Sequence, residues 1–162
     1  MVRFALVLSF LILTTSANCA SQDAYAPLML YNGGWRVRKA GTPAPDMLQN
    51  HCVRTGFYYE CEQVVNGKTS ALVIFVPAGA PGTYHTQAVL PSGQALGRGD
   101  LTIKGDRWVY LGKDVEKDKT TWYRTTNVFT GGNHIHYEQA QSTDGTHWTA
   151  SGSGDEDRVS AN

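Results

Sequence analysis

The sequence predicts an all-β domain in which a single antiparallel meander closes into a barrel of about 8–10 strands, and three observations lead to it. Turn-forming pairs such as Asn66-Gly67, Gly105-Asp106 and Gly131-Gly132 recur along the chain. Short runs rich in Val, Ile, Thr, Tyr, Phe and Trp lie between them. The runs follow one another without a long crossover, and a meander that closes on itself leaves no exposed strand edge.

The turn signals divide the chain into short strands. We expect strands near residues 34–40, 47–55, 57–65, 69–77, 83–90, 99–104, 107–112, 121–130, 133–142 and 146–151. A helical turn or two is expected only within Ala24–Tyr31, and the stretch Lys113–Lys119 alternates in charge and predicts a solvated loop. The last residues, 152–162, predict a frayed polar tail.

Residues that pair across a two-residue turn lie on the same face of the sheet, so each hairpin can be tested for an apolar face. The expected pairs include Leu101 with Tyr110, Ile103 with Trp108, Tyr59 with Ile74, Cys61 with Leu72, Val128 with Ile135 and Trp148 with Gln141. Each hairpin then presents one apolar or aromatic face, which is what a barrel interior requires.

The N-terminal residues predict export. Arg3 gives a short positive start, Phe4–Leu13 is apolar, and small or polar residues follow in Thr14–Ala20. This order is typical of a signal peptide, and the apolar run is too short to span a bilayer. Cleavage after Ala17 or after Ala20 would both fit, so the pattern leaves open whether Cys19 remains in the mature chain. We expect a periplasmic or secreted protein without a membrane anchor.

Charge excludes two classes of partner. The chain carries 14 basic and 14 acidic residues, and Arg3 is the only charged residue in the first twenty. The mature chain is therefore close to neutral. We expect no nucleic-acid binding, which usually requires a basic stripe, and no polybasic patch for anionic membranes.

Cys52 and Cys61 predict one disulfide, because two thiols outside the cytoplasm usually pair. A Gly56-Phe57 turn would place the two cysteines directly opposite each other on neighbouring strands. A Thr55-Gly56 turn would instead leave them diagonal on the same face, and bridging would need adjustment.

Gly33-Gly34-Trp35 resembles the Gly-x-Trp opening of the calycins, which include lipocalins, fatty-acid-binding proteins and nitrobindin-like barrels. Ser142–Trp148 similarly resembles an S-x-D-G-x-x-W hairpin of secreted bacterial calycin-like proteins of unknown function. The resemblance implies that Trp35 closes one barrel end beneath an arginine from the last strand or tail. Arg158 is the only basic residue after Arg124 and is the candidate for that partner.

The N-terminal pattern, the expected strands and the plug that the resemblance implies together divide the chain. Residues 1–20 would be the signal peptide, 21–33 a plug segment, 34–153 the barrel and 154–162 a polar tail. The nitrobindin-like glycines after the Trp are replaced here by Arg36-Val37-Arg38, and we expect no cofactor.

Aromatic residues form the main candidate ligand-binding set. Its members are Tyr59, Trp108, Tyr110, Trp122, Tyr137 and Trp148. In a hollow barrel these rings would line a pocket for a small apolar or amphipathic ligand. In a filled barrel they would form the core, and the protein would be a structural or partner-binding barrel.

His134, His136 and Glu138 alternate along one expected strand and therefore share a face. Imidazole and carboxylate groups are metal ligands, so a metal-dependent enzyme is an alternative. The neighbouring Ile135 and Tyr137 require the core, which favours a polar outer face for the other set without bound metal. The sequence contains no nucleophile elbow. Our leading interpretation is thus an exported, non-enzymatic barrel that binds a small ligand.

Overall fold

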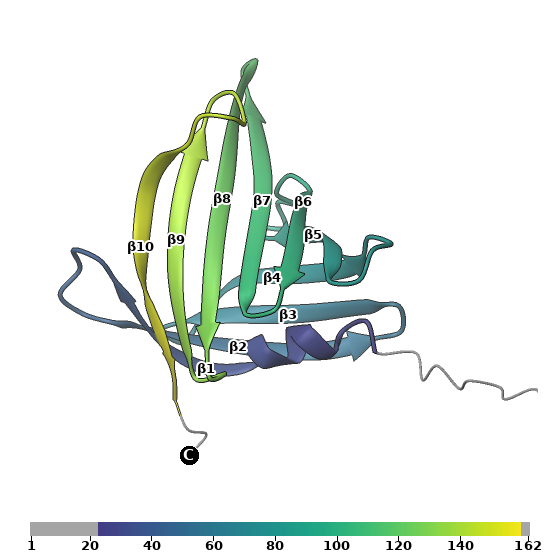
Figure 1. The fold of residues 1–162 in the computed structure, drawn as a ribbon, viewed down its shortest axis with the longest axis vertical. Coiled ribbons are helices and arrows are strands. Elements are labelled where there is room, and N and C mark those ends of the chain that lie inside the picture. The colour runs from purple at the N-terminus through teal and green to yellow at the C-terminus, as the bar shows by residue number, and fades with distance from the viewer. Residues whose placement is uncertain (1–22, 160–162) are drawn as a thin grey trace, which may run out of the picture.

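Hairpins between consecutive strands build a closed barrel of ten antiparallel strands in the computed structural model, which describes residues 23–159 (Figure 1). The elements are η1 (Ala26–Tyr31), β1 (Gly33–Lys39), β2 (Asp46–Thr55), β3 (Tyr58–Val65), β4 (Lys68–Pro77), β5 (Thr83–Val89), β6 (Gly99–Lys104), β7 (Arg107–Glu116), β8 (Lys119–Thr130), β9 (His134–Ser142) and β10 (Thr149–Arg158). Each strand pairs with its neighbours in the sequence, and β1 pairs with β10 to close the sheet. The predicted all-β meander barrel is confirmed.

The β6–β7 hairpin has the expected register. Leu101 pairs with Tyr110 and Ile103 with Trp108 across the Gly105-Asp106 turn. Leu101 and Trp108 are almost fully buried inside the barrel, so the aromatic face that the pairing predicted is an interior face.

The β8–β9 hairpin differs from the prediction by one residue. Thr130 pairs with His134, so three residues rather than two form the loop, and Phe129 instead of Val128 lies opposite Ile135. A shift of one residue exchanges the two faces of a strand. Phe129 and Asn127 are accordingly buried.

The β3–β4 hairpin differs for another reason. Tyr59 pairs with Phe75 and Cys61 with Val73, because an irregularity at Gln63/Val64 lets β4 contain one additional residue. Such a bulge reverses the alternation beyond it. The expected partners of Tyr59 and Cys61, Ile74 and Leu72, therefore belong to the opposite face.

The last strand extends further than the sequence predicted. β10 continues to Arg158 rather than ending near residue 151, and the expected tail from residue 154 is part of the barrel. Glu156 pairs with Val37 of β1 on one side and with Ile135 of β9 on the other. Polar and glycine residues have little intrinsic strand preference, so pairing on both sides is what holds this segment extended.

The predicted disulfide is present. Cys52 and Cys61 are direct cross-strand partners, and a bond joins their sulfur atoms. Thr55 pairs with Tyr58, which corresponds to the Gly56-Phe57 turn of the two turns considered. The bond links β2 to β3 close to the tip of their hairpin.

η1 closes one end of the barrel (Figure 1). Leu28 is buried among the core side chains, and the Tyr25 ring stacks on Tyr59 at 5.8 Å between centroids. The hydroxyl of Tyr84 donates a hydrogen bond to the carbonyl of Ala24 just before η1. The last carbonyls of a helix lack partners within it, and here the barrel supplies donors, because Trp35 Nε1 and Asn50 Nδ2 both donate to the carbonyl of Tyr31.

No helix within residues 23–159 is long and apolar enough to cross a membrane. The expected signal peptide and Cys19 lie outside the described residues, and so do the last three residues of the chain.

Candidate ligand cavity

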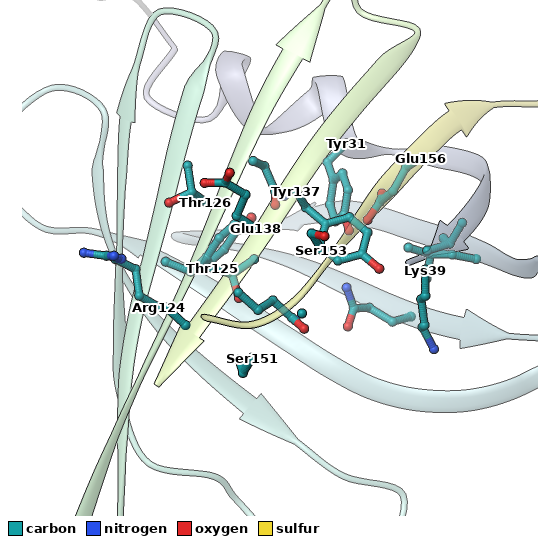
Figure 2. Close-up of a pocket in the computed structure, with 18 of the residues that line it drawn as sticks. Tyr31, Lys39, Arg124, Thr125, Thr126, Tyr137, Glu138, Ser151, Ser153 and Glu156 are labelled. Carbon is teal, nitrogen blue, oxygen red and sulfur yellow. The ribbon is translucent and has the colours of Figure 1, made fainter. Parts of the chain in front are cut away.

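A cavity of about 1350 Å³ occupies the part of the barrel that η1 does not fill (Figure 2). Apolar side chains on its wall include Val37, Leu48 and Val73. Exposed Thr42 in the β1–β2 connection also borders the cavity, which therefore opens to solvent on that side. The volume exceeds the ~300–1,000 Å³ typical of small-molecule sites.

Small interior side chains leave this space open. Thr86 and Ala88 of β5 pair with Phe75 and Val73 of β4, and all four border the cavity. At the closed end, β5 contributes Tyr84 at the equivalent interior position, where 2% of the residue is exposed. The change from a large to small residues along one strand accounts for part of the hollow.

Gly154 allows Tyr137 to face the cavity. The two residues are cross-strand partners. A Cβ at position 154 would lie 2.6 Å from the Tyr137 hydroxyl and 2.2 Å from the carbonyl oxygen of Arg38. Neither distance is compatible with a side chain, so glycine is required there by close approach of its neighbours.

The inner end of the cavity contains a buried acid. Glu156 is only 7% exposed, borders the cavity and lies beside Tyr31 in Figure 2. Its neighbours in the sheet, Val37 and Ile135, are buried apolar residues. Burial raises the pKa of Glu156 to about 7, and hydrogen bonding with Tyr31 acts in the opposite direction. The carboxyl group therefore titrates near neutral pH.

Three tyrosines surround this acid. Burial raises the pKa of Tyr31 and of Tyr110 well above the ordinary value, and the charge of Glu156 raises each further. Burial is also the largest cause of the raised pKa of Tyr137, to which Glu156 again contributes. All three hydroxyls stay protonated at physiological pH and remain hydrogen-bond donors.

The outer part of the cavity contains an ion pair. Lys39 Nζ lies 2.6 Å from a carboxylate oxygen of Asp46, and both residues border the cavity. A hydrogen bond and the charge of Asp46 raise the pKa of Lys39. Lys39 belongs to β1 and Glu156 to β10.

Only some of the aromatic residues predicted to bind a ligand border the cavity. Tyr110 and Tyr137 border the cavity, and Trp148 does so beneath the guanidinium of Arg124. Tyr59 and Trp108 are instead packed in the filled core.

Trp122 is separate from the other five rings. It pairs with Ser142 and Lys113, whereas the interior face of β8 carries Thr125 and Asn127. The ring lies 5.3 Å from the ammonium group of Lys113. The prediction that Trp122 lies on the ligand-binding face was wrong. It assumed a two-residue turn at Gly131-Gly132, where the structure has a three-residue loop.

Trp35 and Arg158 meet at the closed end. They are cross-strand partners between β1 and β10, and the guanidinium carbon lies 4.2 Å from the centre of the indole. The indole Nε1 donates to the Tyr31 carbonyl at 3.0 Å. Arg158 donates to the carbonyls of Leu30, Asn32 and Gly132. One arginine thus connects η1, the β8–β9 loop and the last strand.

His134 and His136 lie on the outer face of β9, whereas Glu138 of the same strand borders the cavity (Figure 2). His134 Nδ1 is 2.8 Å from a carboxylate oxygen of Asp157, and His136 Nδ1 is 3.0 Å from one of Asp155. Glu138 pairs with Ser153 in the sheet. Within residues 23–159, no group of three His, Cys, Asp or Glu side chains has a geometry that could hold a metal ion.

Sequence reasoning missed three buried polar residues, two of which, Asn127 and Glu156, border the cavity. Asn50, Asn127 and Glu156 are buried, although none was predicted to face the interior. Asn127 was predicted on the outer face because the predicted β8–β9 register differs by one residue from the observed one. Glu156 was predicted to belong to the polar tail. Alternation of Gly154, Glu156 and Arg158 along one strand was the available signal for the last of these.

Comparison with known proteins identifies a structural neighbour. No family model and no curated protein sequence matches the chain. The crystal structure of Rv2717c from M. tuberculosis superposes with a TM-score of 0.51 over 86% of this chain and 99% of that chain, at 16% sequence identity. At this identity the similarity shows the shared barrel fold alone.

Proposed function

We propose that the protein is an exported, non-enzymatic calycin-like barrel that holds a small apolar or amphipathic molecule in its interior. The observation that carries the proposal is the cavity of about 1350 Å³, bordered by apolar and aromatic side chains with a few polar groups. This composition is typical of small-molecule sites. In a filled structural barrel, side chains would occupy this volume.

Two further features support the proposal. The Gly33-Gly34-Trp35 opening and its arginine partner resemble those of calycins, a superfamily that includes lipocalins. The pattern of Arg3, Phe4–Leu13 and the small residues after them is typical of a signal peptide. The metal-enzyme alternative gains no comparable support, because His134 and His136 are each paired with an aspartate.

Binding of the neutral, polarity-sensitive dye Nile red tests the proposal. We expect the wild-type protein to bind the dye with increased fluorescence. Ala88→Trp should weaken binding by about tenfold or more, because an indole at this position would occupy cavity volume; such a loss corresponds to at least ~1.4 kcal/mol.

Val115→Trp is the matched control, because Val115 is 62% exposed and does not border the cavity. This variant should bind the dye as the wild type does. No binding by the wild type, or equal binding by Ala88→Trp and wild type, would contradict a ligand site inside the barrel.

A further inference from the structure

Glu156 has no basic partner among residues 23–159. Two arginines of β1 flank Val37, the partner of Glu156 in the sheet: Arg38 forms an ion pair with Asp157, and Arg36 is exposed. Of the two basic residues that border the cavity, Lys39 pairs with Asp46, and Arg124 lies over the ring of Trp148. A buried carboxylate without a counter-charge is costly, which is why burial raises the pKa of Glu156. A cation bound beside this group would favour its charged form.

Unpaired hydrogen-bond acceptors gather in the same region. Glu156 Oε2, Asn50 Oδ1 and Asn127 Oδ1 are enclosed and have no hydrogen-bond partner in the described part of the chain. Glu156 and Asn127 border the cavity. Asn50 uses its amide nitrogen to donate to the carbonyl of Tyr31, which leaves only its oxygen free. Ionised carboxylate and amide oxygens accept hydrogen bonds, so a ligand group complementary to Glu156 and Asn127 is a donor.

Aromatic rings complete this environment. Tyr31 from η1, Tyr110 from β7 and Tyr137 from β9 all border the cavity, and each lies close enough to Glu156 for its charge to affect the tyrosine. The faces of aromatic rings attract cations. Carboxylate, amide oxygens and tyrosine rings together are therefore suited to a positively charged donor group.

We propose that the cavity binds an amphipathic amine, with the protonated amino group against Glu156 and the apolar body against Val37, Leu48, Val73 and Phe75. This inference rests on the proposed function and specifies the chemical class of its ligand. A protonated amine supplies both the missing charge and several N–H donors. A fatty acid would place a second negative charge beside Glu156, and a neutral alcohol would leave the carboxylate uncompensated.

Binding of an amine beside Glu156 should depend on pH. The titratable groups closest to Glu156 in the cavity are Tyr31, Tyr110 and Tyr137, and these stay neutral. The cavity is also bordered by Lys39 and Asp46, which are paired with each other, and by Glu138. His134, Asp155 and Asp157 alternate with the interior residues of their strands and face outward. Since the pKa of Glu156 is about 7, the preference for an amine should increase as pH rises from about 5.5 to 8, while an alkylamine remains protonated.

Displacement of Nile red by three molecules of equal chain length tests the assignment: dodecylamine, dodecanol and dodecanoate, each below its micelle concentration. At pH 8, we expect the amine to displace the dye at about tenfold lower concentration than the alcohol and the carboxylate to be weakest, a ratio equivalent to ~1.4 kcal/mol. In Glu156→Gln the amine and alcohol should become equivalent, while the alcohol binds as before.

Glu116→Gln is the matched control, because it makes the same change of charge at an exposed residue outside the cavity. It should keep the wild-type preference. The pH dependence in the wild type provides a second measurement that needs no variant.

Several results would overturn the assignment. Equal displacement by amine and alcohol, an amine preference that persists in Glu156→Gln, or a preference that is unchanged between pH 5.5 and 8 would each do so, while cavity binding itself would stand. If none of the three molecules displaced the dye, the assignment would also fall, and equal dye binding by Ala88→Trp and wild type would then remove the proposed function with it.

Discussion

The two ends of the barrel interior are built from the same alternating strands but are occupied differently. At the closed end, Trp35, Trp108 and Phe129 form an aromatic cluster, with the last two rings 4.6 Å apart between centroids. At the open end, the corresponding interior positions hold smaller or polar residues such as Ala88, Thr125 and Gln139, and the space between them is a cavity. The strands that surround both ends belong to one closed sheet.

This difference separates stability from binding within one sheet. Close-packed aromatic side chains stabilise the closed end, where loss of volume is costly. The open end contributes less buried area and therefore tolerates changes that alter ligand specificity. Glu156 lies between the two, because it borders the cavity but is buried as deeply as the core.

Removal of the central closed-end ring should have the largest effect on stability. Trp35 is fully buried, and Trp35→Ala should reduce the free energy of unfolding by about 3–5 kcal/mol through lost burial and the cavity created. Gln139→Ala at the open end should change it by less than about 0.5 kcal/mol. Urea unfolding of both variants measures the difference, and losses of similar size would remove the distinction between the ends.

The alternation that defines both ends was readable from the sequence, whereas its interruptions were not. Gly105-Asp106 forms a two-residue turn, and the pairs across it were predicted. The Cys52–Cys61 pairing was predicted for one of two possible turns, Gly56-Phe57, and this turn is the one that forms. The bulge at Gln63/Val64 and the three-residue loop after Thr130 each move a strand by one residue. Nothing local requires these shifts, since they satisfy pairing with strands on both sides.

The candidate site was harder to predict than the fold for the same reason. Tyr110 and Tyr137 were identified from alternation alone. Glu156 lies in a polar sequence that becomes a strand only because β1 and β9 supply partners on either side. The filled or hollow state of the barrel also depends on how η1 packs, which turn signals do not report.

The pH dependence of stability should show whether Glu156 is shielded from water like the core or exposed to it like the open end. Its pKa is raised from 4.5 to about 7 on folding. Because the unfolded chain loses this proton at lower pH, the stabilisation is complete below about pH 4.5 and is lost as pH rises to 7, a decrease of about 3 kcal/mol. Glu156→Gln should lack this decrease and be more stable than wild type at pH 8.

The difference between Glu156→Gln and wild type isolates this group from others that titrate. Asp46, Asp144 and Asp157 have lowered pKa values, so their contributions change at more acidic pH. Chemical unfolding between pH 4 and 8 provides the measurement. Parallel curves for the two proteins would show that Glu156 reaches water, and would place it with the open end.

The smallest expected effect concerns the contact that joins the chain ends at the closed side. Arg158→Ala removes the cation–π contact with Trp35, worth about 0.5–2 kcal/mol, and the hydrogen bonds to the carbonyls of Leu30, Asn32 and Gly132. Water can reach part of this site and replace some of those bonds, so the net loss should be about 1–2 kcal/mol. For a domain of this size, the melting temperature should fall by roughly 3–8 °C. Tryptophan fluorescence should shift as Trp35 becomes hydrated.

Lys119→Ala is the control, at an exposed residue beside the β7–β8 turn, and should change neither the melting temperature nor the fluorescence. Identical melting curves for wild type and Arg158→Ala would mean that η1 and the aromatic cluster close the barrel without the arginine. The calycin resemblance would then rest on the Gly-x-Trp opening alone, and the proposed binding function would rest on the cavity without support from that resemblance.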